Sequence, residues 1–474
     1  MASVGQAQDS LLTYKKKVLE NTEVDMLMSY YEQTGTHAAV SGGIGNEALT
    51  NYTPTIVVKM PLSADEVLTA DVGISAYTSA SSSNGNPFNK TGASGGGYND
   101  DDDDDDDDGD YTNGANTAPS GSPWVASSGA SYKDVLTSIA LNYARSSEDR
   151  NTIWNTRLST SFEYDYESFG IGAGVSKLLA DKNAELSLKA QVYLDRWKPI
   201  TPTEIHEFLQ FGDTFLTNDR SYFWNVSVID AQGVPSTAYR PLAVDYDRVD
   251  RNTYSASFLF SQILSSFAQV ALFADFVQQE GLLSNPLQRV YFSDRPNYFI
   301  GEANQIPFYD TTQNTAVFQL ADDVERLPNS RTKIPVGARL HLYLSERLVV
   351  RSYFRHYWDD WGISSNTLQL ELPIKLGLNW KITPTYRFYN QTAADYFAPF
   401  DQHLSTQSFY TSDYDLSAFD SRQWGLGVSY TDLFTAKRIW KAGLKSADIR
   451  YQRYSRSDGL RASIVSTAIK FILD

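Results

Sequence analysis

The chain has 474 residues, a formal net charge of −17 and no cysteine. The negative charge argues against a nucleic-acid partner, because phosphates require a basic surface, and the lack of any continuous apolar run of about 18 residues excludes a helical membrane protein. The length would suit about three ordinary domains, but no change in composition separates them, and the absence of cysteine suits an oxidising envelope compartment.

The first residues are interpreted as the end of a secretory signal peptide, with residues 1–23 forming this remnant and a periplasmic tether. Small residues precede a cleavage point after Ala7, and Lys15, Lys16 and Lys17 lie in the polar tether. The basic and apolar parts of a signal peptide should come before this point and are absent, which favours a truncated or engineered start. An ordinary soluble N-terminus is the alternative.

Strands with one apolar face are predicted through the first half of the chain. In residues 184–197, Leu186 and Leu188 alternate with Glu185 and Lys189, and this period of two residues is typical of a strand whose two faces differ. The same pattern predicts strands at 24–33, 51–61, 67–79, 132–145, 152–166, 169–179 and 184–197.

The alternation is equally clear in residues 334–376, where Leu340 and Leu342 lie on one face of a strand and Arg339 and His341 lie on the other. Tight turns and further strands follow. The strands predicted in this half are 251–262, 267–279, 335–344, 348–358, 366–376, 380–390, 421–430, 449–456 and 460–471, which brings the total to about 16, a number found in barrels.

The predicted strands are too long and too polar on one face for the core of a β-sandwich. In a transmembrane barrel the apolar face meets lipid and the polar face meets a wet lumen. The long connections fall at one end of such a barrel and the tight turns at the other; the long ones are 80–131, 198–250, 280–333 and 391–420. Outer-membrane barrels have long extracellular loops and short periplasmic turns. The predicted fold is therefore all-β, a transmembrane antiparallel β-barrel of residues 24–474.

Segments spread over nearly the whole chain carry a family resemblance. They are SGGIGNEALTNYTP, GISAYTSASSSNGNPF, VDRNTYSASFLFSQI, NPLQRVYFSDR, RTKIPVGARLHLYL, RHYWDDWGI and YTSDYDLSAF. These segments resemble an outer-membrane β-barrel family of unknown function that is typical of Bacteroidota. The resemblance implies fold and location but no activity and no functional residue. Genes of that family often neighbour those of a small lipoprotein, a thioredoxin-like protein and a periplasmic flavin transferase, which implies envelope partners.

An acidic run at 100–110 dominates the connection 80–131. Carboxylate oxygens suit Ca²⁺, and aspartates at alternate positions before Gly109 match the first half of a calcium loop. The match is weak, because Ala115 occupies the position where a bidentate Glu belongs. Two interpretations stay open. One is a disordered acidic loop that binds cations loosely, which is favoured, and the other is an ordered Ca²⁺ site with the ligands Asp104, Asp106, Asp108 and Asp110.

Residues 353–361 are rich in aromatic side chains and lie at a predicted extracellular strand end. They could form a platform for a ligand, or a metal site through His356, Asp359 and Asp360. The favoured interpretation is an interfacial aromatic girdle followed by a polar turn.

Alternation directs five charged side chains into the lumen. As a charged ring they could determine the selectivity of a pore. Equally, they could pair with acidic neighbours or with inserted loops and fill the barrel. The five residues are Arg339, Arg351, Arg355, Glu371 and Arg387.

The sequence offers little for catalysis, and we expect that the protein is not an enzyme. The five histidines are scattered without metal-ligand spacing, and no serine-hydrolase motif, cysteine nucleophile or phosphate loop is present. His403 with Asp401 and Asp413 is the one loop constellation that could resemble a catalytic group.

Two functions remain open. The first is a pore or transport channel in the bacterial outer membrane for small polar solutes or ions, in contact with outer-membrane lipids and with Ca²⁺ as the one expected cofactor. The second is a structural scaffold of a multi-protein outer-membrane complex with lipoprotein and redox or flavin partners.

Overall fold

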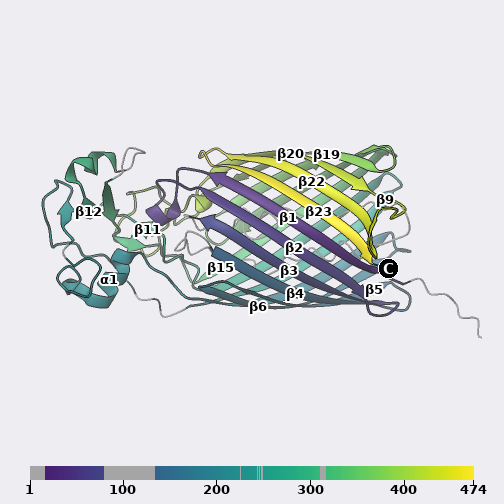
Figure 1. The fold of residues 1–474 in the computed structure, drawn as a ribbon, viewed down its shortest axis with the longest axis horizontal. Coiled ribbons are helices and arrows are strands. Elements are labelled where there is room, and N and C mark those ends of the chain that lie inside the picture. Colours follow the sequence, from purple (N-terminus) through teal and green to yellow (C-terminus); the bar gives the residue numbers. More distant parts are fainter. Residues whose placement is uncertain are drawn as a thin grey trace, which may run out of the picture.

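The structure is a computed structural model that describes residues 17–79, 134–224, 226–242, 244, 246, 249–309 and 316–473. A single antiparallel sheet forms most of it (Figure 1). The strands of its wall are β1 (Thr22–Thr34), β2 (Leu49–Pro61), β3 (Glu66–Ser79), β4 (Asp134–Ser146), β5 (Thr152–Phe162), β6 (Tyr166–Leu179), β7 (Ala184–Trp197), β9 (Asp250–Ser265), β10 (Ala268–Gly281), β15 (Ser330–Ser345), β16 (Leu348–Asp359), β17 (Ser364–Glu371), β18 (Ile374–Leu376), β19 (Trp380–Gln391), β20 (Phe419–Thr431), β21 (Arg438–Ile439), β22 (Ala442–Arg456) and β23 (Arg461–Leu473).

The sheet closes on itself. β1 pairs with β2 on one side and with β23 on the other, where Thr22 lies opposite Leu473. β17 and β18 form one interrupted strand, because both pair with β16 and β19, and β21 is a short addition beside β22. The wall is thus a closed barrel of 16 antiparallel strands, as predicted.

The two faces of the wall differ as the alternation predicts. Large apolar side chains are exposed on the outer face, such as Met26 and Met28 of β1 and Leu368 and Leu370 of β17. An exposed apolar band around a closed barrel is the surface that meets lipid acyl chains. Among the described residues, no helix has the length and hydropathy needed to cross a bilayer.

Several predicted strand boundaries differ from the observed ones. β15, for example, begins at Ser330 rather than at Pro335, and three other differences have a local cause. The strand expected at 152–166 ends at Phe162, because the chain reverses through a tight turn in which the amide of Glu163 donates to the carbonyl of Tyr166 (2.7 Å). The strand expected at 366–376 is interrupted before β18, where Pro373 cannot donate to the sheet. The strand expected at 449–456 begins earlier, at Ala442, and a bulge after Leu444 breaks its alternation.

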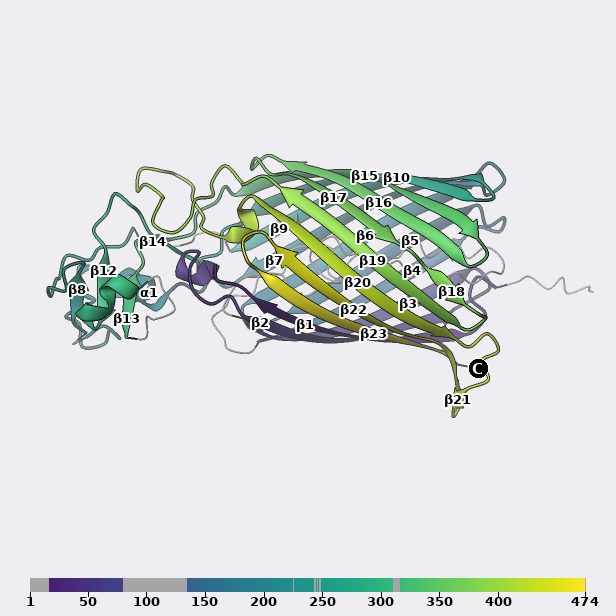
Figure 2. The ribbon, with the colours of Figure 1, turned by 90° about the horizontal axis from the view of Figure 1, so that it is seen from above.

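The connections separate into two classes by barrel end, as predicted (Figures 1 and 2). The described connections at one end, here named the turn end, are mostly tight, and both barrel termini lie there, since Thr22 pairs with Leu473. The other end, here named the cap end, receives the connections 198–249, 282–329 and 392–418. Their described residues form a folded unit that we name the cap.

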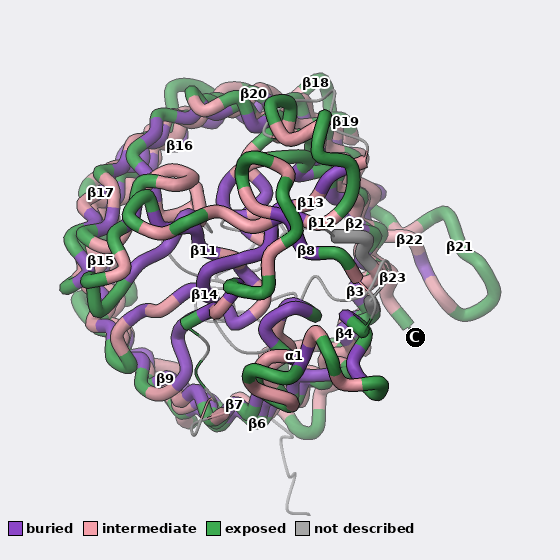
Figure 3. The backbone as a smooth tube through the Cα atoms, turned by 90° about the vertical axis from the view of Figure 1, so that its left-hand side faces the viewer, coloured by how far each residue is buried: buried purple, intermediate pink, exposed green. Residues whose placement is uncertain are grey.

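The cap contains the one α-helix among the described residues and several small β-pairs. It has clusters of buried apolar side chains of its own, one of them built from Phe215, Phe223, Val228, Tyr239 and Leu320. Its segments cross the opening of the barrel (Figure 3). Its elements are α1 (Thr203–Phe211), η3 (Gly212–Thr214), β8 (Val228–Asp230), β11 (Arg289–Val290), β12 (Tyr298–Gly301), η4 (Ala303–Phe308), β13 (Val317–Leu320), β14 (Asp323–Val324) and η5 (Tyr414–Leu416).

The connection between β1 and β2 meets the cap at close range. It carries the short turn η1 (Ala39–Ser41), followed by Gly42 and Gly43 with φ of 76° and 88°. A Cβ atom on Gly43 would lie 2.7 Å from the carbonyl oxygen of Ser412. Glycine is therefore required at Gly43 both for its left-handed backbone and for its contact with the cap.

Candidate functional site

The inner face of β15, β16, β17 and β19 carries the charged residues that the alternation predicts for the lumen. Leu340, Phe354 and Tyr386 are exposed on the outer face, and their sequence neighbours Arg339, Arg355 and Arg387 therefore point inward. Arg351 and Glu371 share this inner face and are buried. The five predicted lumen residues thus lie on one face of four adjacent strands.

Strand pairing arranges part of this face as a row across the wall. Arg339 lies opposite Tyr353, Tyr353 opposite Gln369, and Gln369 opposite Arg387. The guanidinium of Arg339 lies 6.0 Å from the ring centre of Tyr353 and 5.9 Å from that of Phe273, within the range of a cation–π contact. The row thus has an arginine at each end and aromatic and amide groups between them.

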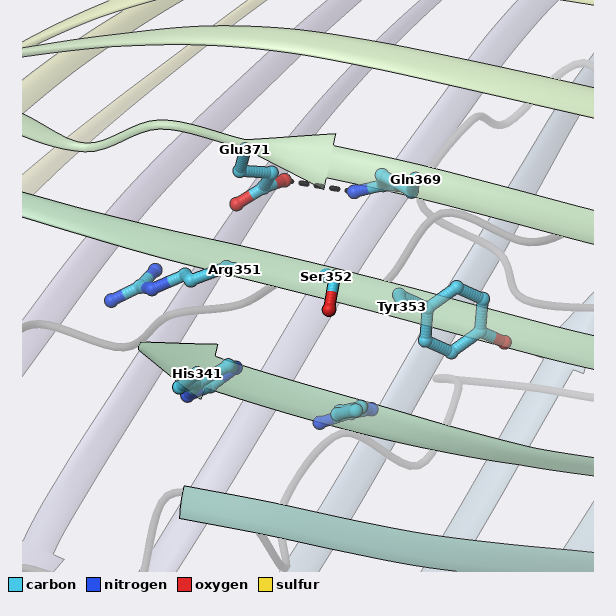
Figure 4. A pocket seen from close by; sticks show the side chains of 7 residues that line it. His341, Arg351, Ser352, Tyr353, Gln369 and Glu371 are labelled. Atoms are coloured by element: carbon cyan, nitrogen blue, oxygen red, sulfur yellow. Dashed lines mark hydrogen bonds between the residues drawn. The ribbon is translucent and has the colours of Figure 1, made fainter. Parts of the chain in front are cut away.

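A second row, nearer the turn end, contains a carboxylate. His341 lies opposite Arg351 and Arg351 opposite Glu371, whose Oε1 accepts a hydrogen bond of 2.8 Å from Nε2 of Gln369. The two rows border a small, partly open pocket on the lumen side of the wall (Figure 4). The residues lining it are Arg339, His341, Arg351, Ser352, Tyr353, Gln369 and Glu371.

Asp275 of β10 supplies a further negative charge to this face. Its carboxylate interacts electrostatically with Arg355, Lys189 and Arg339. In this part of the described wall the arginines outnumber the carboxylates Glu371 and Asp275. On this part of the described wall, arginines and carboxylates therefore share the inner face, with the arginines in excess.

A buried ion pair holds the cap together above the lumen. The carboxylate of Glu204, on α1, accepts from Nε and Nη2 of Arg289, on β11, at 2.7 and 3.3 Å. Nη1 of the same arginine donates to the carbonyl of Val40 in the β1–β2 connection (2.8 Å). Burial lowers the pKa of Arg289, but its pairing with Glu204 outweighs this and leaves the pKa above its usual value. The contact ties three segments that are distant in sequence.

Glu325, which follows β14, is a second buried charge of the cap. Its Oε1 accepts from the hydroxyl of Thr411 (2.5 Å) and its Oε2 from the amide of Asn285 (2.6 Å). Burial raises the pKa of Glu325 to about 8, and the nearby carboxylate of Asp413 adds to the shift. The hydrogen bond from Thr411 thus links two connections of the cap through a carboxyl group that binds a proton near neutral pH.

Asp413 has a similar position at the start of η5. Its Oδ2 accepts from Nε2 of Gln288 (3.1 Å), and burial, followed by the charge of Asp415, raises its pKa to about 6. Asp415 in turn pairs with Arg456 at the cap end of β22 (2.5 Å). These contacts place carboxylates with raised pKa values where the cap meets the barrel.

In the described residues, the remaining predicted constellations are not assembled as metal sites. His403 is buried, and its ring nitrogens lie 3.1 Å from Oε1 of Gln407 and 2.9 Å from the carbonyl of Thr411, whereas Asp413 interacts with Gln288. Within the part of the chain that the structure describes, no group of histidines and carboxylates could hold a metal ion.

The aromatic segment 353–361 divides between the two faces of the wall. His356 lies on the outer face, where it approaches Asn366 (2.9 Å) and the ring of Trp358. Asp359 instead pairs with Arg331 (2.5 Å), and Asp360 accepts from the amide of Thr332 (2.9 Å). The favoured interpretation, a girdle with a polar turn, agrees with this arrangement.

Two predicted features lie outside the described residues. They are the acidic ligands Asp104, Asp106, Asp108 and Asp110, and the cleavage point after Ala7.

The sequence does not predict the cap, because its pattern assigns the connections that form the cap to loops. One sequence pattern does indicate an element of the cap. Ile205, Phe208 and Leu209 have the spacing of one apolar face of a helix, and they fall in α1. The ion pair between Glu204 and Arg289 has no comparable signal, because its partners are 85 residues apart.

The closed wall, apolar outside and polar inside, defines a transmembrane β-barrel. The chain belongs to the family described as "Protein of unknown function (DUF3570)", whose profile matches residues 1–460. A comparison with curated proteins returns no match.

Several solved structures resemble the barrel. A bacterial polysaccharide outer membrane secretin matches with 9% identity and a TM-score of 0.41, covering 96% of this chain and 99% of its own. A TodX monoaromatic hydrocarbon channel mutant matches with 8% identity and a TM-score of 0.39, covering 96% and 91%. A BenF-like porin from Pseudomonas fluorescens Pf-5 matches with 7% identity and a TM-score of 0.38, covering 96% and 98%. These scores are too low to support an argument, so the assignment of a barrel depends on the strand pairing itself.

Proposed function

We propose that the protein is an outer-membrane channel for small polar solutes or ions and that it prefers anions. The observation that carries the proposal is the excess of arginine on one inner face of the wall, with Arg339 and Arg387 at the two ends of one row. Charged side chains that line a pore bias which ions pass, and a barrel of this strand number can leave an aqueous channel.

The outer-membrane location is supported by the closed barrel with its exposed apolar band, because bacterial outer-membrane proteins cross the bilayer in this form. The cap end then faces the cell exterior and the turn end faces the periplasm. Solute would reach the lumen past the cap. Calcium binding by the acidic run at 100–110 remains a separate prediction.

Ion selectivity in a planar bilayer tests the proposal. Under a KCl gradient, the reversal potential of the purified barrel should indicate anion preference. Replacing Arg339, Arg351 and Arg387 together by Gln should move the reversal potential towards that of a non-selective pore. Arg422→Gln is the matched control, because Arg422 is exposed on the outer face of β20 and its loss should leave selectivity unchanged. A reversal potential that the triple variant does not move would contradict the proposal.

A structural scaffold is the second candidate, favoured by the packed cap. Its apolar clusters, such as that of Ile205, Tyr291, Ala321 and Val324, give the cap a fixed surface of the kind that a partner can bind. Folded protein that gives no conductance, and that co-purifies with an envelope lipoprotein in a native pull-down, would favour the scaffold over the channel. Recovery of the barrel alone would count against the scaffold.

A further inference from the structure

The connection between β20 and β22, residues 432–441, projects from the barrel at the turn end; we name it the arm. Figures 2 and 3 show that it extends sideways from the wall beside β22 and β23, rather than along the barrel axis. A segment that leaves a transmembrane barrel sideways at the edge of its apolar band lies in the plane of the membrane interface.

The arm is held in place by hydrogen bonds. The amide of Asp432 donates to the carbonyl of Lys445 (2.7 Å), and the amide of Leu444 donates to the carbonyl of Lys437 (2.7 Å). The carboxylate of Asp432 accepts from the amide of Lys437 (2.9 Å). Within the arm, β21 pairs with the first residues of β22. The side chains of the arm are thus presented by an ordered backbone.

The apolar side chains of the arm are displayed outward. Trp440 is 97% exposed, Phe434 87%, Ile439 67% and Leu433 51%. Exposed apolar groups gathered on one projection mark a surface that binds lipid or protein. The described parts of the cap and of the barrel wall leave these four side chains uncovered.

Basic residues accompany the apolar ones. Lys437, Arg438 and Lys441 lie in the arm, whereas Asp432 is its only acidic residue, and the carboxylate of Asp432 is engaged by the arm's own backbone. Aromatic and aliphatic groups beside lysine and arginine are the composition of segments that lie in the headgroup region of a bilayer with anionic lipids.

Contact with aromatic side chains on the outer face at the turn end places the arm at the height of the interface. The ammonium of Lys437 lies 4.3 Å from the ring centre of Tyr430, and Tyr430 packs against Trp380 with ring centres 5.0 Å apart. Trp380 is exposed on the outer face at the turn end of β19. Tyrosine and tryptophan at the end of an apolar band mark the boundary between acyl chains and headgroups.

We propose that the arm is a lipid anchor. Its four apolar side chains enter the leaflet that surrounds the turn end, and Lys437, Arg438 and Lys441 bind the phosphate groups of anionic lipids there. The partner is a lipid surface, and the anchor fixes the height of the turn end in the bilayer independently of what the lumen transports.

Site-directed spin labelling tests the proposal cleanly, because the chain has no cysteine. The label is placed at Ile439→Cys, which keeps Phe434 and Trp440, in the full-length protein reconstituted in vesicles of phosphatidylethanolamine and phosphatidylglycerol. Glu346→Cys, in the exposed turn between β15 and β16 at the same barrel end, is the matched control. Collisions with lipid-soluble oxygen are compared with collisions with an aqueous nickel chelate.

We expect the label at 439 to collide more often with oxygen than with the nickel chelate, and the label at 346 to show the reverse. The depth parameter, which is the logarithm of the ratio of the two collision rates, therefore has opposite signs at the two positions. Replacing Phe434 and Trp440 by Ser should reverse the sign at 439. Replacing Lys437, Arg438 and Lys441 by Gln should make the label shallower in anionic vesicles but not in phosphatidylcholine vesicles. A label at 439 that is as accessible to the nickel chelate as the label at 346 would overturn the proposal, and protection from both reagents would instead indicate a protein partner.

Discussion

The hydroxyl of Thr411 donates a hydrogen bond of 2.5 Å to the carboxylate of Glu325, and this contact joins two long connections of the cap. Burial raises the pKa of Glu325 to about 8, whereas an unfolded glutamate has a pKa near 4.5. A carboxyl with a raised pKa in the folded state gives stability that is fully present below the unfolded pKa and is lost as the pH rises through the folded pKa.

We therefore expect the cap to loosen as the pH rises from about 4.5 to 8 and above. Hydrogen exchange of the described residues in 282–329 and 403–417, corrected for the intrinsic pH dependence of exchange, should show protection reduced by at least about tenfold at the alkaline end. Each unit by which the folded-state pKa of Glu325 exceeds its unfolded-state pKa changes the opening equilibrium by about tenfold. Glu325→Gln should flatten this dependence. Glu346→Gln, at an exposed turn, should leave it intact.

Breaking the pair of Glu204 with Arg289 should unfold the cap without opening the barrel. Glu204→Gln leaves a buried guanidinium without its charge partner, which costs about 3–5 kcal/mol. Proteolysis of the cap should become much faster, while the heat-dependent mobility of the barrel in detergent gels should not change. Asp213→Asn is the comparison, because Asp213 pairs with Arg240 at an exposed position and such pairs contribute little. Equal effects of the two variants would contradict the expectation.

A comparison of alanine variants at two glycines separates the cost of a left-handed backbone from the cost of a close contact. Gly43 and Gly45 both have φ of 88°, but a Cβ atom on Gly43 would lie 2.7 Å from the carbonyl oxygen of Ser412, whereas one on Gly45 would have nothing within 4 Å. Alanine at either position should cost about 1–2 kcal/mol through its left-handed backbone. Gly43→Ala should destabilise the cap further, and the difference between the two variants, measured by limited proteolysis, gives the contribution of the contact.

Asp359 should be a structural residue of the wall's cap end. Its carboxylate accepts from Arg331, from the hydroxyl of Tyr357 (2.7 Å) and from two backbone amides of the following turn. Asp359→Asn should lower the free energy of unfolding in urea by about 3 kcal/mol, because it leaves Arg331 buried without its partner. Asp360→Asn, which weakens one exposed hydrogen bond to Thr332, should have a much smaller effect. If Asp360→Asn were the more damaging variant, this assignment would be wrong.

The barrel could be predicted from the sequence because lipid on one side of the wall requires strict alternation over ten or more residues. In 184–197 the predicted and observed bounds coincide. The prediction failed where a local feature interrupts that alternation, as at the bulge after Leu444 and at Pro373.

The sequence predicts which side chains face the lumen, but it does not predict the cap. Alternation alone indicates that Arg339 and Arg387 face inward, but their placement in one row depends on the register of three strand pairs. The cap depends on contacts such as that between Gln288 and Asp413, which are 125 residues apart. Such pairs leave no periodic pattern in the chain, so only the folded structure identifies them.

The pairing of Thr22 with Leu473 has a consequence for biogenesis. The first strand of the wall cannot complete its hydrogen bonds until the last strand has been synthesised and exported, so the N-terminal half must wait with an open edge that is prone to mispairing. Closure joins the two most distant parts of the wall and should be the slow step of assembly. Once closed, reporter groups attached to the two ends would emerge on the same side of the membrane and within energy-transfer distance of each other.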